Sequence, residues 1–153
     1  MGFELGPEWA AAGLAGLFVA SFLAATVLPF SSEAVLLAMT AGPWDPWTLL
    51  AVASAGNWLG GMSSYGLGRL GDMQRIARWL RVDQDRVSRM QLRIARYGAW
   101  SALLCWAPVI GDPIAIALGL VRAPLASTAV LMLVGKAARY AVLLLTAQAF
   151  AMA

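Results

Sequence analysis

Two long uncharged runs of apolar residues constrain this chain more than any other feature of its sequence. Residues 9–30 and residues 47–68 each form a run of 22 residues that contains no Asp, Glu, Lys or Arg. A helix of that length is about 33 Å long, which is enough to cross the hydrocarbon core of a bilayer. A chain segment in lipid must satisfy its own backbone hydrogen bonds, so such runs are expected to be helical. The sequence therefore predicts an all-α integral membrane protein.

The composition agrees with this class and gives no sign of an enzyme. Hydrophobic residues make up 61% of the chain and charged residues 12%, against about 45–50% and about 25% in a soluble domain. The chain has no histidine and one cysteine, and its acids form no cluster with ligand spacing. We therefore predict no catalytic residue, no metal site and no cofactor. No Ser/Gly-rich or Pro-rich linker divides the chain, so residues 1–153 are expected to form a single membrane domain.

Two apolar blocks are interrupted by a proline that is followed by an acid. The stretch "TVLPFSSEAVLLAM" begins at Thr26 and contains Pro29 and Glu33. The second interruption, in "WAPVIGDPIAIALG", comes from four residues: Pro108, Gly111, Asp112 and Pro113. Proline removes a backbone donor and clashes with the preceding helical turn, so each helix is expected to break there and fold back as a hairpin.

The same pattern recurs at an offset of 79 residues. Five pairs share this offset: Pro29 with Pro108, Glu33 with Asp112, Ala38 with Ala117, Gly56 with Gly135, and Asn57 with Lys136. The fold class that follows is two re-entrant helical hairpins in an inverted repeat, plus spanning helices. The halves are residues 9–68 and 98–150, each a hairpin and one full span. The competing topology is four plain spans; hairpins place both termini outside the cell, and four spans place both inside.

A basic segment, residues 69–97, separates the two halves. It holds eight of the eleven basic residues, and they stand against three acids. Its apolar residues recur at helical spacing, which is typical of an amphipathic helix on the membrane surface; a solvated helix without contact to lipid is the alternative. By the positive-inside rule, either form lies in the cytoplasm.

Four charged residues lie within apolar blocks: Glu33, Asp112, and, in the last apolar block from Leu125 to the C-terminus, Lys136 and Arg139. Left unpaired at the membrane centre, each would cost about 2.5–3.5 kcal/mol. Two acids and two bases can compensate one another, and Lys136 and Arg139 are three residues apart, on one helical face. We therefore expect Glu33 to pair with one of these two cations.

These charges and Asn57 are the candidate transport residues. Acids beside broken helices are typical of ion and substrate sites in secondary transporters, so Glu33 and Asp112 are also candidate proton carriers. The alternative is a purely structural role, in which ion pairs and Asn57 hold helices together without transport.

Three motifs carry a resemblance to a known family: "LPFSSE", "GNWLGGMSSYGLGR" and "RYGAWSALLCWAPVIGDPIAIALG". Together they resemble the DedA/VTT superfamily, also called SNARE-associated Golgi protein-like, and in particular its YqaA-like branch. The resemblance implies two opposed re-entrant hairpins in the bacterial inner membrane. It also implies movement of phospholipid or polyprenyl phosphate between leaflets, with proton coupling in several members.

The resemblance extends to individual residues. Five of them match family motifs: Glu33 after the first break, then Gly56, Tyr65, Gly68 and Arg69. Pro108 matches the proline of the second hairpin. The chain departs from the family at Asn57, where Asp is usual. It also has Trp106 and Asp112 where the family has arginines beside that proline. Lys136 and Arg139 are the residues that could restore the missing positive charge.

Three functions remain open from the sequence. The first is translocation of a lipid or lipid phosphate in the manner of a flippase or scramblase, with or without proton coupling. The second is transport of a small ion or cationic solute, and the third is a non-transporting role in organising the membrane. The expected partners are membrane lipids, anionic headgroups, protons and a second copy of the chain; nucleic acid is not expected.

Overall fold

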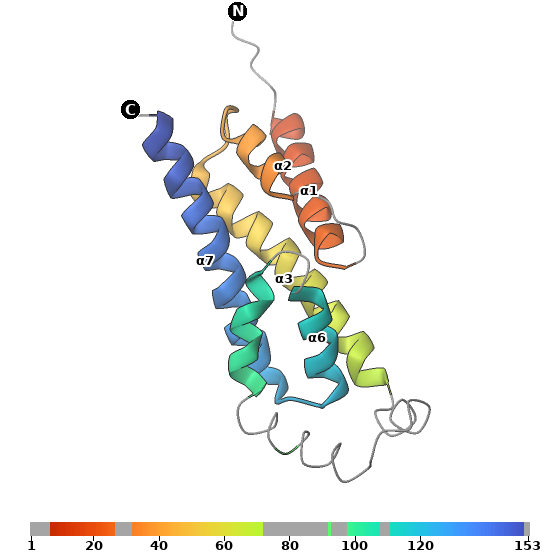
Figure 1. Cartoon of the computed structure of the whole chain (residues 1–153). Helices are drawn as coiled ribbons and strands as arrows, with labels where there is room; N and C mark the ends of the chain where they lie inside the picture. Colours follow the sequence, from red (N-terminus) through yellow and green to blue (C-terminus); the bar gives the residue numbers. More distant parts are fainter. Residues whose placement is uncertain (1–6, 27–31, 72–91, 93–97, 108–110, 152–153) are drawn as a thin grey trace, which may run out of the picture. The chain divides into compact units, whose positions relative to one another are not determined.

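A computed structural model describes residues 7–26, 32–71, 92, 98–107 and 111–151 (Figure 1). In these ranges every regular element is helical, as predicted. Six are bounded as follows: α1 (Pro7–Ala24), α2 (Ser32–Met39), α3 (Pro46–Leu70), η1 (Ala102–Trp106), α6 (Gly111–Leu120) and α7 (Leu125–Ala151). Most of the predicted basic segment, including the arginines between residues 75 and 96, lies outside the described residues.

The first apolar block forms two helices. Helix α1 ends at Ala24, and α2 is a short helix of eight residues that begins at Ser32. The two helices contact each other and lie side by side in Figure 1. Pro29, the expected cause of the interruption, lies outside the described residues. That the pair re-enters a membrane stays a prediction.

The second interrupted block also forms two helical segments in contact, η1 and α6. Pro108 lies outside the described residues. Gly111 begins α6 beside the carbonyl oxygen of Cys105, where a Cβ atom would collide. Pro113 does not break a helix here. It occupies the first turn of α6, where its missing N–H leaves no intrahelical bond unmade.

The chain divides into two compact units. Unit 1 comprises Met1–Gly60 and Ala137–Ala153, and unit 2 comprises Gly61–Lys136. Helices α3 and α7 each supply residues to both units, so this division differs from the two predicted repeat halves. The inverted repeat itself stays a prediction.

Unit 1 has an apolar core drawn from four helices. Its buried members are Leu17, Leu36, Leu49, Ala53, Tyr140 and Leu144. Two glycines bring α3 against α1: a Cβ atom on Gly60 would lie 2.5 Å from the carbonyl oxygen of Phe22, and one on Gly56 would collide with that of Phe18. Small residues thus allow close helix packing in this unit.

In unit 2, α3 crosses α6 at a reciprocal pair of glycines. A Cβ atom on Gly68 would collide with the carbonyl oxygen of Ile116, and one on Gly119 with that of Tyr65. Each helix thus presents a glycine to the backbone of the other. A larger residue at either position would force the two helices apart.

One described stretch, Leu125–Ala149 of α7, is both long enough and apolar enough to cross a membrane, with a mean hydropathy of 1.7. Helices α1 and α6 are apolar but shorter. Helix α3 covers the second predicted span with 25 residues. It is less apolar than α7 because serines, glycines and Asn57 interrupt its apolar residues.

Candidate functional site

An ion pair in unit 1 joins two of the predicted charged residues. The Arg139 guanidinium, on α7, donates to the Glu33 carboxylate, in the first turn of α2. The side chains are 18% and 32% exposed, respectively. A carboxylate at a helix N-terminus is favoured by the helix dipole as well as by its partner. The structure thus confirms the expected pairing of Glu33 with a cation of the last apolar block and selects Arg139.

A hydrogen-bonded network lies directly beside this ion pair. The Ser32 and Tyr140 hydroxyls are 2.7 Å apart, and Asn57 Nδ2 donates to the Tyr140 hydroxyl over 2.8 Å. Ser32 precedes Glu33 in α2, and Tyr140 follows Arg139 in α7. Two consecutive residues of one helix therefore meet two consecutive residues of another, and Asn57 of α3 completes the network.

Burial separates the charged part of the site from the neutral part. Tyr140, Ser32 and Asn57 are 1%, 4% and 6% exposed, respectively, whereas Glu33 and Arg139 are partly exposed. The ion pair therefore faces the surroundings of unit 1, and the hydroxyl and amide groups lie inside it. Charged groups at the accessible end can exchange partners more readily than the buried network can.

Two further buried hydroxyls lie in the same unit. Within the described ranges, Ser21 Oγ and Ser54 Oγ have no hydrogen-bond partner. Ser54 is three residues before Asn57 and therefore on the same side of α3. Buried polar groups in proteins are almost always bonded, commonly to water. The hydroxyls of Ser21 and Ser54 can therefore form further hydrogen bonds, to water or to other oxygen atoms.

Asp112 and Lys136 belong to unit 2, whereas Glu33 belongs to unit 1. Lys136 is 4% exposed, and its Nζ lies 3.1 Å from the position of a Cβ atom on Gly61. Lys136 and Asp112 both lie close enough to Cys105 to act electrostatically on its thiol.

The family-motif residues of α3 divide between the units. Gly56 packs on α1 in unit 1. In unit 2, Arg69 Nη1 donates to the Tyr65 hydroxyl over 2.9 Å, and that hydroxyl donates to the Ala123 carbonyl over 2.6 Å. Tyr65 thereby fixes both an arginine and the chain after α6, while Gly68 lies at the crossing with α6.

Sequence reasoning missed the two hydroxyls at the centre of the network, Ser32 and Tyr140. One signal was available, because each is adjacent to a charged residue that was singled out. It was insufficient, since a serine or tyrosine within an apolar run is ordinarily part of the packing.

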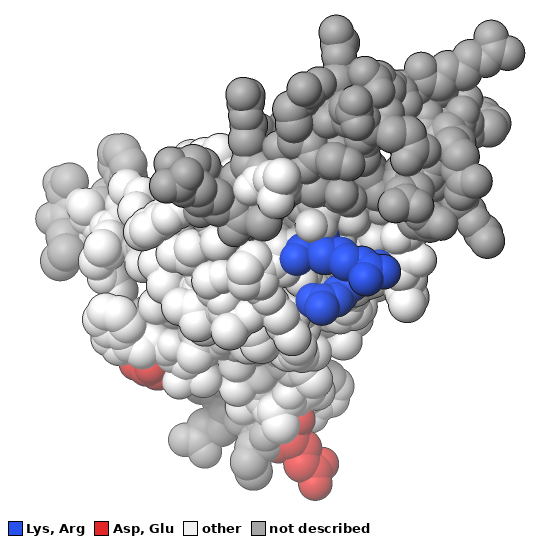
Figure 2. Space-filling view, turned by 90° about the horizontal axis from the view of Figure 1, so that it is seen from below, with Lys and Arg blue, Asp and Glu red and all other residues white. Residues whose placement is uncertain are grey.

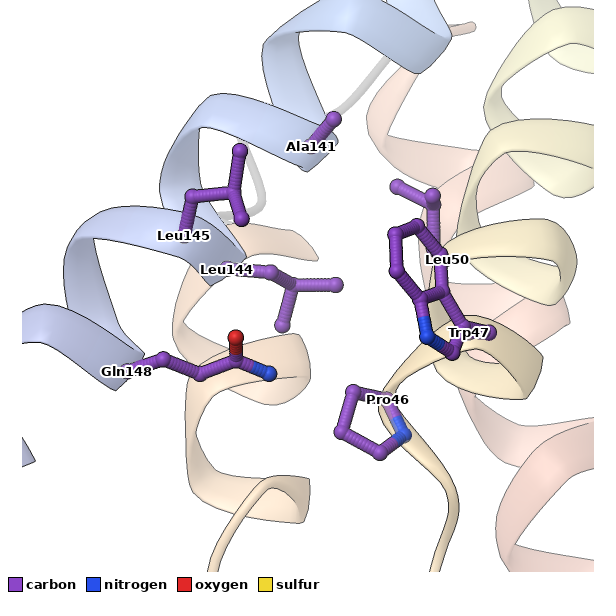
Figure 3. Close-up of a pocket in the computed structure, with 7 residues that line it drawn as sticks. All are labelled: Pro46, Trp47, Leu50, Ala141, Leu144, Leu145 and Gln148. Carbon is purple, nitrogen blue, oxygen red and sulfur yellow. The ribbon is translucent and has the colours of Figure 1, made fainter.

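Unit 1 also contains a small apolar cavity of about 40 Å³ (Figure 3). Its lining residues are Pro46, Trp47, Leu50, Ala141, Leu144, Leu145 and Gln148. Leu144 of α7 points toward Leu50 and Trp47 of α3. The cavity is too small for a headgroup and has no charged lining residue, so we do not assign it to the candidate site. Among the described residues, no group of three or more acidic or cysteine side chains could hold a metal ion.

Comparison with known proteins agrees with the sequence motifs. The VTT domain family matches residues 28–148. The chain is 39% identical over 131 residues to the Inner membrane protein YqaA of Escherichia coli (strain K12), covering 85% of this chain and 87% of that protein. The same values hold for the Shigella flexneri protein of that name. An uncharacterized protein of Haemophilus influenzae is 33% identical over 155 residues, covering 93% of this chain and 92% of the relative.

No solved structure matches the chain significantly. The matched range includes Glu33, Asn57, Tyr65, Arg69 and Arg139, so both hydrogen-bonded groups described above fall within it. By these motifs, and by the extent and identity of the matches, the chain belongs to the VTT domain family within the DedA superfamily.

Proposed function

We propose that this protein resides in the bacterial inner membrane and moves a lipid with an anionic headgroup between the leaflets. The observation that carries the proposal is the partly exposed ion pair between Glu33 and Arg139. The localisation rests on the composition and on the names of the relatives from Escherichia coli and Shigella flexneri.

Another anion can take the place of the Glu33 carboxylate on Arg139. Arginine presents a planar set of donors that fits phosphate as well as carboxylate. An incoming headgroup phosphate can therefore take the place of Glu33 on Arg139, and the guanidinium keeps a counter-charge throughout. Protonation of Glu33 removes its attraction for Arg139 and favours the exchange, which couples the step to a proton.

The neutral part of the site supports the same exchange. Tyr140, Ser32 and Asn57 hold α2, α3 and α7 together and offer donors and acceptors to headgroup oxygens. The hydroxyls of Ser21 and Ser54 add unfilled hydrogen-bonding capacity in the same unit. Such groups reduce the cost of bringing a polar headgroup among apolar helices.

The proposed topology has two re-entrant hairpins in an inverted repeat, with the basic segment 69–97 in the cytoplasm. The contacts between α1 and α2, and between η1 and α6, support the hairpins. A reporter fused to the C-terminus tests the topology. An external C-terminus agrees with hairpins, and an internal one agrees with four plain spans.

The ion pair favours an anionic over a cationic substrate. A bound Arg139 neutralises Glu33 and repels a cation that approaches the same carboxylate. The competing interpretation is that the pair only stabilises the fold. It predicts that variants lacking the pair lose stability but move lipid at the normal rate per folded molecule.

The test is movement of fluorescent phosphatidylglycerol in vesicles that contain the purified protein. Arg139→Gln is expected to abolish movement, and Glu33→Gln to remove its dependence on a pH gradient. The matched control is Glu8→Gln, which neutralises an exposed acid of α1 and should behave as the parent protein. Normal, gradient-dependent movement in both site variants would overturn the proposal, as would uptake of a cationic solute without lipid movement.

A further inference from the structure

The turn after α6 contains an arginine in a conformation usually given to glycine. Arg122 has a φ of 56°, the left-handed region. Its N–H donates to the Gly119 carbonyl over 2.9 Å, and the Ala123 N–H donates to the Leu118 carbonyl over 3.0 Å. These two bonds define a Schellman motif, in which glycine is the common residue at the left-handed position because it has no Cβ atom. The backbone conformation at this position favours glycine and so does not explain why an arginine is present.

The Arg122 side chain is not required to cap α6. The backbone bonds of the Schellman motif already satisfy the carbonyls of Leu118 and Gly119. Arg122 is exposed, so its guanidinium extends from the turn toward the surroundings. An arginine that carries a backbone cost here, and that the helix does not need, points to a role outside the fold.

A second exposed arginine is held at the same turn. Arg69 donates to the Tyr65 hydroxyl, which in turn donates to the carbonyl of Ala123, the residue after Arg122. Tyr65 is 2% exposed, so a buried side chain fixes the position of Arg69 relative to the turn. Figure 2 shows a patch of blue Lys and Arg side chains on the face seen from below. The exposed basic residues of unit 2 in the described ranges are Arg69 and Arg122.

The surroundings of the two arginines fit a bilayer interface. Three leucines close to them in sequence are exposed: Leu67 by 67%, Leu70 by 85% and Leu125 by 52%. The described acid of unit 2, Asp112, is ten residues from Arg122, about 15 Å away along α6. Exposed leucines suit acyl chains, and arginine heads suit the phosphate layer above them.

We propose that Arg69 and Arg122 bind the phosphate of an anionic phospholipid at the membrane surface. This headgroup site lies in unit 2 and uses neither Glu33 nor Arg139, so it goes beyond the proposed transport step. The exposed leucines favour a phospholipid over a soluble phosphate as the ligand, because acyl chains can pack against leucines and a free phosphate cannot.

Two variants separate this role from a structural one. Arg122→Gly relieves the left-handed strain, so the purified protein in detergent is expected to be at least as heat-stable as the parent. Arg69→Gln leaves the turn intact. Each arginine near a membrane surface strengthens binding of anionic lipid about fivefold, so each variant is expected to weaken phosphatidylglycerol binding by about that factor. Arg122→Lys, which keeps the charge, is expected to retain most of the affinity.

Binding is measured on the full chain in detergent. Phosphatidylglycerol, phosphatidylcholine or inorganic phosphate is titrated into the protein. Native mass spectrometry reports how much lipid is retained, and thermal unfolding reports how much the protein is stabilised. A preference for phosphatidylglycerol that falls in both variants supports the site. Equal affinity for the two lipids, or an unchanged preference in both variants, would overturn it. Inorganic phosphate stabilising the protein as well as phosphatidylglycerol would overturn the assignment to a lipid.

Discussion

The two partners of the Glu33–Arg139 pair should be energetically coupled in unit 1. In Glu33→Gln, Arg139 keeps its charge but loses its carboxylate. In Arg139→Gln, Glu33 is left among apolar helices. The double variant carries neither charge, so its loss of stability should be smaller than the sum of the two single losses.

The size of this coupling follows from the exposure of the two side chains. Fully exposed pairs are worth about 0.2–1 kcal/mol, and breaking a buried pair costs about 3–5 kcal/mol. With Arg139 18% and Glu33 32% exposed, the pair lies between these limits. We expect a coupling free energy of about 1.5 kcal/mol, which corresponds to slightly more than a tenfold change in the unfolding equilibrium.

The assay is reversible unfolding in mixed micelles, with the four proteins of a double-mutant cycle measured in parallel. A control cycle combines Arg139→Gln with Glu8→Gln, which removes an exposed acid instead of Glu33; its effects should add. A coupling below about 0.5 kcal/mol for Glu33 and Arg139, or an equal coupling in the control cycle, would show that the pair is not a specific interaction.

Three other substitutions test the packing and the network through the same unfolding measurement. Gly119→Ala places a Cβ atom on the Tyr65 carbonyl and should lower the free energy of unfolding by about 1–3 kcal/mol. Its control is Gly66→Ala, where a Cβ atom meets nothing within 4 Å, and this variant should be neutral or stabilising. Equal effects of the two substitutions would contradict the close crossing of α3 and α6. Tyr140→Phe removes two buried hydrogen bonds and should cost about 1–3 kcal/mol; no loss would mean that the network carries little energy. Asp45→Ala removes the side chain that accepts from an N–H in the first turn of α3 and should cost about 1 kcal/mol; unchanged stability would show that the cap contributes little.

Most of the fold followed from the apolar pattern. Uncharged runs predicted helices, and the structure shows that two glycines of α3, Gly56 and Gly60, allow close packing on α1 in unit 1. Pro113 was grouped with the expected break at Pro108, and the structure places it in the first turn of α6. Proline is tolerated in the first turn of a helix, and the sequence does not show at which residue α6 begins.

The candidate site was only partly predictable. The cost of an unpaired charge in lipid predicted that Glu33 would find a cation, but two cations were available. The choice of Arg139 over Lys136 depends on how α2 and α7 meet, which no local pattern encodes. Tyr140 and Ser32 were missed for the same reason. Whether a hydroxyl in an apolar run forms a hydrogen bond depends on which residue of another helix lies opposite it.

The arrangement of the network has a consequence for how α2 can move. Ser32 and Glu33 are neighbours in α2, and both bond to neighbours in α7. Adjacent residues on a helix point about 100° apart, so turning α2 by one position moves both side chains away from their partners together. A rotation of α2 would therefore break the hydroxyl bond and the ion pair together. Protonation of Glu33 would weaken the ion pair and leave the Ser32–Tyr140 bond as the polar contact between α2 and α7, while Leu36 stays packed in the core.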